Sequence, residues 1–301
     1  MNAQISRLWQ ARDPAEPWEA PYTEREGGFY YRGYYAGHPS VPSTPDDLPA
    51  GSFESLRQAC SVTDLGQLLV IPSCVRLIGQ GSRKVITPQQ VLGIGAQAVG
   101  LWAEKPEPGL KVSIPLDSLC AIDDVHILLY GKLSFISSTR RLTIRYNTVC
   151  RRVLEPILSA LRKTLAGPGL PVPSRACPDQ EDGASAPAVI PFKWNFLLHS
   201  SFSTLDDSAP RLYQFSEEPR RSGRKRAPRG HLMIVTPYEL VSLQDPVESF
   251  HSYGVDSVFI PRARIQGVTV HAKGVEVSSR GASLSLPLPP QLLSAVGGWF
   301  S

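Results

Sequence analysis

Apolar and polar residues alternate along several stretches of this 301-residue chain, which is the pattern of strands with one buried face. Leu133 and Phe135 alternate with polar residues before the segment SSTRR, and Leu142, Ile144 and Tyr146 alternate with polar residues after it. The pattern predicts an antiparallel hairpin whose five apolar side chains face a core.

Helical spacing replaces this alternation after residue 148. The predicted apolar face consists of Val149, Val153, Leu154, Ile157, Leu158, Leu161 and Leu165. Basic residues take the opposite face, namely Arg151, Arg152, Arg162 and Lys163. Pro156 lies inside the segment, where it is expected to kink the helix or to mark a new first turn. A shorter apolar run, PQLLSAVGGWF, predicts a second, curtailed helix with Trp299 packed against the strands.

Three blocks recur in the same order in the two halves of the chain, which indicates an internal repeat. The matched positions are Thr87-Pro88 with Thr236-Pro237, Ile114-Pro115 with Ile260-Pro261, and Gly131 with Gly274. Proline at the second position of a tight turn presets its φ angle, so Pro88 and Pro237 are each expected at the tip of a hairpin.

Breaks in composition divide the chain into four parts. Residues 1–55 form an irregular arm rich in Tyr, Pro and Gly, and residues 167–191 form a proline-rich linker. Residues 56–166 and 192–301 are the two repeated domains, and a basic loop at 217–230 belongs to the second. We expect the two domains to fold separately.

The repeated unit resembles the pleckstrin-homology-like (PH-like) superfold, including its GRAM-type and bacterial members. The resemblance is carried by the strand-turn segments VITP and IVTP, by the strands SIPLDSLCAI and FIPRARIQGV, and by the closing helix. It implies a mainly β fold with some α structure, in which two PH-like β-barrels or sandwiches are each closed by a C-terminal helix. The helix tryptophan of classical PH domains has no counterpart in VCRRVLEPILSALRKTL, which favours the divergent relatives over the phosphoinositide readers.

Composition and charge exclude several classes of protein. A net charge of +4 is too small for a global field that would drive binding to nucleic acid or membrane. The chain contains no uninterrupted apolar run long enough for a transmembrane helix and no N-terminal secretory signal, so we expect a cytoplasmic protein. Its five cysteines contain no C-x-x-C motif, so we predict reduced thiols, no metal site and no cofactor.

Two motifs raise the question of catalysis. The segment from Gly93 to Ala98 fits the dinucleotide fingerprint G-x-G-x-x-[GA], but Pro106 and Pro108 follow too closely for the long helix that such a site requires. Asp124 and His126 could be metal ligands on one strand face. The favoured interpretation is a turn carboxylate pair, Asp123 and Asp124, beside a partly exposed histidine. We therefore expect a protein that is not an enzyme.

Two groups of residues are candidates for binding. A basic cluster in the second domain is a candidate for contact with anions or an acidic partner, and consists of Arg220, Arg221, Arg224, Lys225, Arg226 and Arg229. An aromatic cluster in the arm is a candidate for partner docking or for packing on its own domain, and consists of Phe29, Tyr30, Tyr31, Tyr34 and Tyr35.

The function that the sequence favours is a non-catalytic adaptor or assembly subunit that binds protein partners through its PH-like domains. Exposed strand edges and the grooves beside the closing helices would provide the binding sites. The first alternative is a peripheral membrane protein that binds anionic lipid through the basic loop. The second is a tandem PH module associated with nucleic acid or histones.

Overall fold

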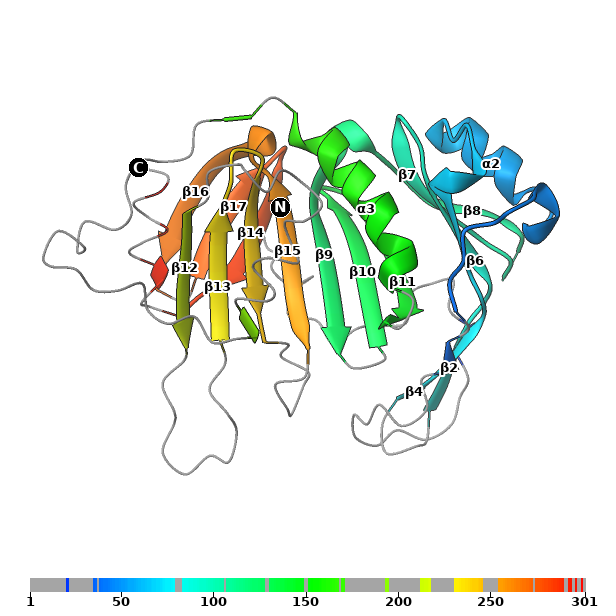
Figure 1. Cartoon of the computed structure of the whole chain (residues 1–301), viewed down its shortest axis with the longest axis horizontal. Helices are drawn as coiled ribbons and strands as arrows, with labels where there is room; N and C mark the ends of the chain where they lie inside the picture. The colour runs from blue at the N-terminus through cyan, green and yellow to red at the C-terminus, as the bar shows by residue number, and fades with distance from the viewer. Residues whose placement is uncertain are drawn as a thin grey trace, which may run out of the picture.

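The computed structural model describes a mainly β protein in which every pair of neighbouring strands is antiparallel (Figure 1). The described residues are 20–21, 35–36, 38–78, 83–105, 107–127, 130–148, 151–167, 169–170, 193–194, 212–217, 230–245, 254–272, 274–289, 292–293, 296 and 299. Within these residues the strands form four open sheets, none of which closes on itself. The predicted mainly β class is confirmed.

The first half begins with a long hairpin that is interrupted at two prolines. One arm consists of β3 (Leu68–Ile71) and β4 (Cys74–Ile78), and the other of β5 (Arg83–Thr87) and β6 (Gln90–Ile94). Ile71 pairs with Gln90 and Cys74 pairs with Thr87, so the register is unchanged across the interruption. Pro72 and Pro88 lie in this gap, where their missing N–H groups cannot contribute to the ladder.

The prediction of a hairpin tip at Pro88 is therefore wrong, because β5 and β6 pair with different strands and not with each other. The same prediction is confirmed for Pro237. There β13 (Gly230–Val235) pairs with β14 (Glu239–Gln244), and the Thr236 N–H donates to the Glu239 carbonyl at 2.9 Å.

The remaining elements of the first half follow in chain order. They are β7 (Ala98–Ala103), β8 (Gly109–Pro115), the 3₁₀ turn η3 (Leu116–Ser118), β9 (Leu119–Ile127), β10 (Tyr130–Ser137), β11 (Arg141–Asn147) and α3 (Arg151–Ala166). The hairpin predicted around SSTRR is confirmed as β10 and β11, and its five predicted apolar side chains are buried. The predicted closing helix is also confirmed, and it continues through Pro156.

The second half repeats this order. It consists of β12 (Leu212–Glu217), β13, β14, β15 (Val255–Pro261), the 3₁₀ turn η6 (Arg262–Arg264), β16 (Ile265–His271), β17 (Gly274–Ser279) and β18 (Ala282–Pro287). In each half a four-stranded meander ends at an Ile-Pro pair and a 3₁₀ turn, and a three-stranded meander follows. By this topology β6 corresponds to β13. Thr87-Pro88 precedes β6, whereas Thr236-Pro237 follows β13, so the Thr-Pro pairs matched in the sequence lie one strand apart in the repeated fold.

The two halves share one sheet. β9 of the first half pairs with β15 of the second, with Ile122 opposite Phe259 and His126 opposite Val255. The result is a seven-stranded sheet with the order β11-β10-β9-β15-β14-β13-β12, which runs across the molecule in Figure 1. The outer edge of β9 is thus completed by a strand of the other half, and the separate folding of the two halves stays a prediction.

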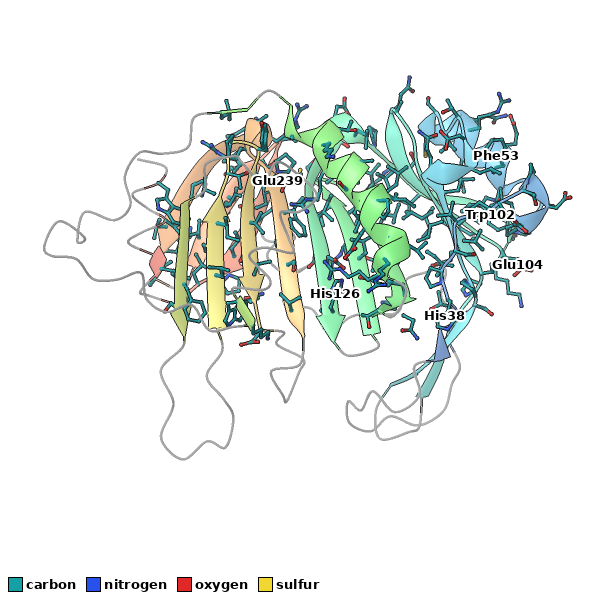
Figure 2. The ribbon with its side chains drawn as sticks, in the orientation of Figure 1. His38, Phe53, Trp102, Glu104, His126 and Glu239 are labelled. Atoms are coloured by element: carbon teal, nitrogen blue, oxygen red, sulfur yellow. The ribbon has the colours of Figure 1, made fainter. Side chains whose placement is uncertain are left out.

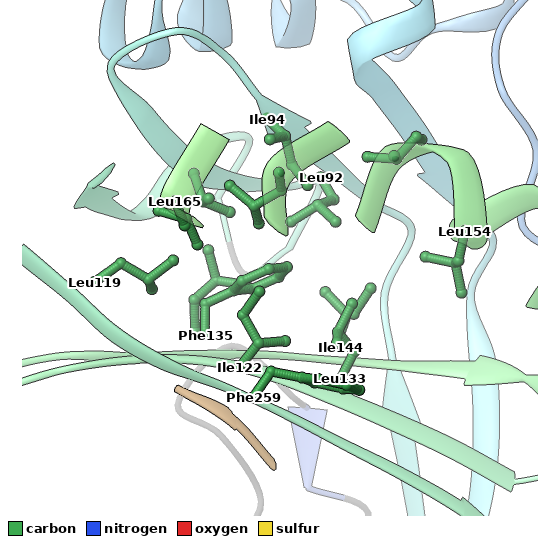
Figure 3. Close-up of a cluster of buried hydrophobic side chains, with 14 of the residues drawn as sticks. Leu92, Ile94, Leu119, Ile122, Leu133, Phe135, Ile144, Leu154, Leu165 and Phe259 are labelled. Atoms are coloured by element: carbon green, nitrogen blue, oxygen red, sulfur yellow. The ribbon is translucent and has the colours of Figure 1, made fainter. Parts of the chain in front are cut away.

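Three apolar clusters hold the layers together. The largest lies between the sheet β3-β6-β7-β8, helix α3 and one face of the seven-stranded sheet, and includes Leu92, Phe135, Leu165 and Phe259 (Figure 3). The second joins the opposite face of β13–β15 to β16–β18 and includes the predicted Trp299, which is buried. The third packs helix α2 (Ser52–Cys60) on the outer face of β6 and β7.

Two short strands of the predicted N-terminal arm pair with the chain's own strands. β1 (Ala20–Pro21) pairs with β5, and β2 (Tyr35–Ala36) pairs with β4. The short turns η1 (Pro45–Asp47) and η2 (Leu65–Gln67) flank α2.

No helix in the described part of the chain combines the length and the apolarity that a membrane crossing requires.

Candidate functional site

The motif Asp123-Asp124-x-His126 lies inside β9, so the prediction of turn carboxylates beside a partly exposed histidine is wrong. Asp124 and His126 share the face that is turned toward α3, and Asp124 Oδ1 lies 2.8 Å from His126 Nε2. Tyr146 of β11 donates its hydroxyl to Asp124 Oδ1 at 2.9 Å. Arg151, at the start of α3, lies with Nη1 3.0 Å from His126 Nε2, and Figure 2 shows His126 beside this end of the helix.

The surroundings of Asp124 favour its charged form. Burial disfavours ionisation of Asp124, but the neighbouring His126 and Arg151 and the Tyr146 hydroxyl outweigh burial and lower the pKa of Asp124. Asp124 and Tyr146 are only 2% and 1% exposed, so this part of the cluster lies inside the fold. The cluster therefore ties the first turn of α3 to β9 and β11.

Asp123 faces the opposite side of the seven-stranded sheet, as strand alternation requires. Arg141 Nη2 donates to Asp123 Oδ2 at 2.9 Å and also to Ser134 Oγ at 2.9 Å. Asp256 of β15 lies on the same face, since it is opposite Val125, two residues along β9 from Asp123. Gln244 donates to Asp256 Oδ2 at 2.8 Å.

These two carboxyl groups meet where the halves of the chain join. Asp256 is partly exposed as a residue, but its Oδ1 atom is buried. Burial, followed by the negative charge of Asp123, raises the pKa of Asp256 to about 8. Sequence reasoning missed this pair, because Asp123 and Asp256 belong to different halves of the repeat and only the pairing of β9 with β15 brings them together.

The glycines of the fingerprint-like segment serve helix packing. A Cβ atom on Gly95 would lie 2.0 Å from the Cys60 carbonyl oxygen, and one on Gly93 would lie 3.1 Å from Leu56 Cδ2. The segment is the turn between β6 and β7, and strand β7 follows it. This confirms the interpretation of an ordinary strand pair without a phosphate-binding helix.

Most of the predicted binding residues lie outside the described part of the chain. These are the whole basic cluster (Arg220, Arg221, Arg224, Lys225, Arg226, Arg229) and, from the aromatic cluster, Phe29, Tyr30, Tyr31 and Tyr34. Tyr35 is described in β2, where it pairs with Val75 of β4. The two binding predictions therefore stay predictions.

A different surface is visible at the edge of the three-stranded sheet. Within the described residues β16 pairs only with β17. Gln266, Gly267, Thr269, Val270 and His271 of β16 are exposed. The strand contains no Lys, Arg, Asp or Glu, so it lacks the charges that commonly protect edge strands from pairing with another chain. We call the free side of residues 265–271 the β16 edge.

Val270 is the most conspicuous residue of this edge. It is 41% exposed and belongs to a small set of exposed large apolar side chains in the described residues. Val268, two residues earlier, packs against the second apolar cluster. The apolar face of β16 is thus covered by the core at Val268 and exposed at Val270.

Within the described residues, no group of three or more His, Cys, Asp or Glu side chains could hold a metal ion. Cys60 and Cys120 are free and buried, and burial raises the pKa of both thiols.

Comparison of the chain with models of protein families, with curated proteins and with solved structures found no significant match. The resemblance to the PH-like superfold therefore stays a prediction from the sequence pattern.

Proposed function

We propose that this chain is an adaptor or assembly subunit that docks an extended segment of a protein partner on the β16 edge. The observation that carries the proposal is an edge strand that is exposed at five of its seven residues and has no protecting charge. Such an edge binds a partner by strand addition, in which backbone hydrogen bonds supply affinity and side chains supply specificity.

The repeated topology supports a PH-like scaffold. In PH-like folds a four-stranded and a three-stranded meander pack on each other and a C-terminal helix closes the unit. Each half of this chain has the two meanders in that order, and α3 follows the first. In the second half, the place that corresponds to α3 is taken by Leu292, Val296 and Trp299, which pack against the strands of that half.

The junction between the halves supports strand addition at this place in the fold. β9 and β16 occupy the same place in their halves, as the first strand after the 3₁₀ turn. The outer edge of β9 is paired over five residues with β15. The outer edge of β16 is the equivalent position in the second half.

The test compares Val270→Lys with a matched control, Val41→Lys, in full-length protein. Val41 is 38% exposed and lies outside the β16 edge. The two variants therefore add the same charge and remove a similar exposed apolar area. Each variant is used as bait in quantitative affinity capture from its source cells. We expect Val270→Lys to lose partners that wild type and Val41→Lys retain. An identical set of partners for all three baits would contradict the proposal.

A further inference from the structure

The internal repeat identifies which strand fits the β16 edge. In the junction within the chain, β9 receives β15. The equivalent of β15 in the first half is β8, because each is the fourth strand of its meander and each ends at Ile-Pro before a 3₁₀ turn. β8 pairs with β7 on one side and, within the described residues, with no strand on the other.

We propose that the β16 edge binds β8 of a second copy of this chain, which produces a head-to-tail assembly. The inference rests on the proposed function, since it names the partner of the same edge. Because two different surfaces meet, a dimer keeps a free β8 on one copy and a free β16 on the other, and association can continue beyond a dimer.

The register follows from the junction within the chain. Positions of β8 and β9 correspond to positions 146 residues later in β15 and β16, as Pro115 and Pro261 show. Asp124 opposite Ser257 therefore becomes Val270 opposite Lys111 of the second copy, at the point where a bulge shifts the pairing of β8 with β7, and Val125 opposite Asp256 becomes His271 opposite Leu110 just beyond that bulge. Leu110 is 39% exposed, so each strand brings an exposed large apolar side chain to the contact.

One end of β8 already accepts a hydrogen bond from its own chain. Arg140 Nη1 donates to the Ser113 carbonyl at 3.0 Å, within the same half. The pairs from Thr269 to His271 fall beyond this contact, on the part of β8 from residue 110 to 112. Association through these residues leaves the Arg140 contact in place.

The experiment uses the charge of Lys111 to test both the surface and the register. Val270→Lys sets two like charges opposite each other, which disfavours cross-strand pairing. The double variant Val270→Lys/Lys111→Glu restores opposite charges. Val41→Lys is the control for added surface charge. Oligomeric state is measured by sedimentation velocity over a range of protein concentrations.

We expect wild type and Val41→Lys to form concentration-dependent oligomers, Val270→Lys to associate at least about threefold more weakly, and the double variant to regain association. Two results would overturn the inference: wild-type protein that stays monomeric at every concentration, or association that Val270→Lys does not weaken. Failure of the double variant to recover would overturn the register and the assignment of β8.

A second arm separates head-to-tail association from pairing of two β16 edges. A Lys111→Glu/Leu110→Glu variant is altered on β8 and keeps the β16 edge. Head-to-tail association predicts that this variant and Val270→Lys each associate weakly alone, and that mixing the two yields a heterodimer in which the unaltered edges pair. Self-association of the β8 variant at wild-type strength would rule out β8. If Val270→Lys loses other partners while wild type is monomeric, the proposed function stands and the second copy is excluded.

Discussion

Arg162 of α3 and Glu239 of β14, separated by 77 residues in sequence, form a buried ion pair between the two halves of the molecule. Arg162 Nη2 lies 2.6 Å from Glu239 Oε2, and the guanidinium stacks 4.1 Å from the centroid of the Phe259 ring. The helical pattern predicts Arg162 on the face opposite the apolar residues of α3. Arg162 is nevertheless buried, because β14 of the second half covers this side of the helix.

Removing one partner of this pair leaves the other charge buried. We expect Arg162→Ala or Glu239→Ala to lower the free energy of unfolding by about 3–5 kcal/mol. Urea denaturation monitored by circular dichroism measures the loss. The double variant Arg162→Met/Glu239→Leu replaces both charges with apolar groups and should recover most of the stability. A double variant as unstable as the single variants would show that the pair is not the cause.

The raised pKa of Asp256 makes stability depend on pH. Asp256 binds a proton in the folded state up to about pH 8, whereas in the unfolded chain it loses that proton near the ordinary aspartate pKa of 3.8. Its contribution to stability is therefore complete below about pH 4 and is lost as pH rises toward 8. Asp256→Asn imitates the neutral carboxyl group and keeps an acceptor for Gln244.

We expect Asp256→Asn to be more stable than wild type at pH 8 and to have a weaker decline of stability between pH 5 and 8, because wild-type Asp256 has a pKa of about 8 in the folded state. Thermal unfolding at several pH values measures both effects. The charges nearest to Asp256 are Asp123 and Lys132, so Lys132→Met is a useful control for the electrostatic origin. Parallel pH profiles for wild type and Asp256→Asn would contradict this assignment.

The tight contact at Gly95 predicts a structural role for the fingerprint-like segment. Gly95→Ala would bring a Cβ atom against the backbone of Cys60 at the end of α2 and should cost about 1–3 kcal/mol in unfolding free energy. Gly267→Ala meets no atom within 4 Å and serves as the control. Chemical denaturation measures both variants. Equal stability of the two would show that α2 does not need the glycine.

The basic cluster carries the alternative of a peripheral membrane protein. Adjacent cations bind anionic membranes with a strength that salt screens. If this alternative holds, wild type should sediment with anionic liposomes at low salt, and the variant with Arg224, Lys225 and Arg226 changed to Ala should not. Binding that is absent, or that is insensitive to salt and to these substitutions, would remove the lipid hypothesis.

The predictions from sequence were accurate where structure is local. The alternation from Leu133 to Tyr146 identified β10 and β11, because strand periodicity directly marks the buried face. Helix α3 was found for the same reason. The sequence analysis does not predict helix α2. Phe53 and Leu56 lie at helical spacing and provide a signal, but the helix has only nine residues, between Gly51 and Ser61, and follows a proline-rich segment.

The errors concern contacts between distant parts of the chain. Local pattern determined a β-rich chain that repeats a strand order and ends each repeat with apolar helical residues. Only the tertiary structure decided that β3 and β4 form one interrupted strand, that Asp123 meets Asp256, and that Arg162 is buried. The physical reason is that an edge strand offers backbone groups that any strand can pair with, and sequence alternation shows which face is buried without showing which neighbour completes the edge.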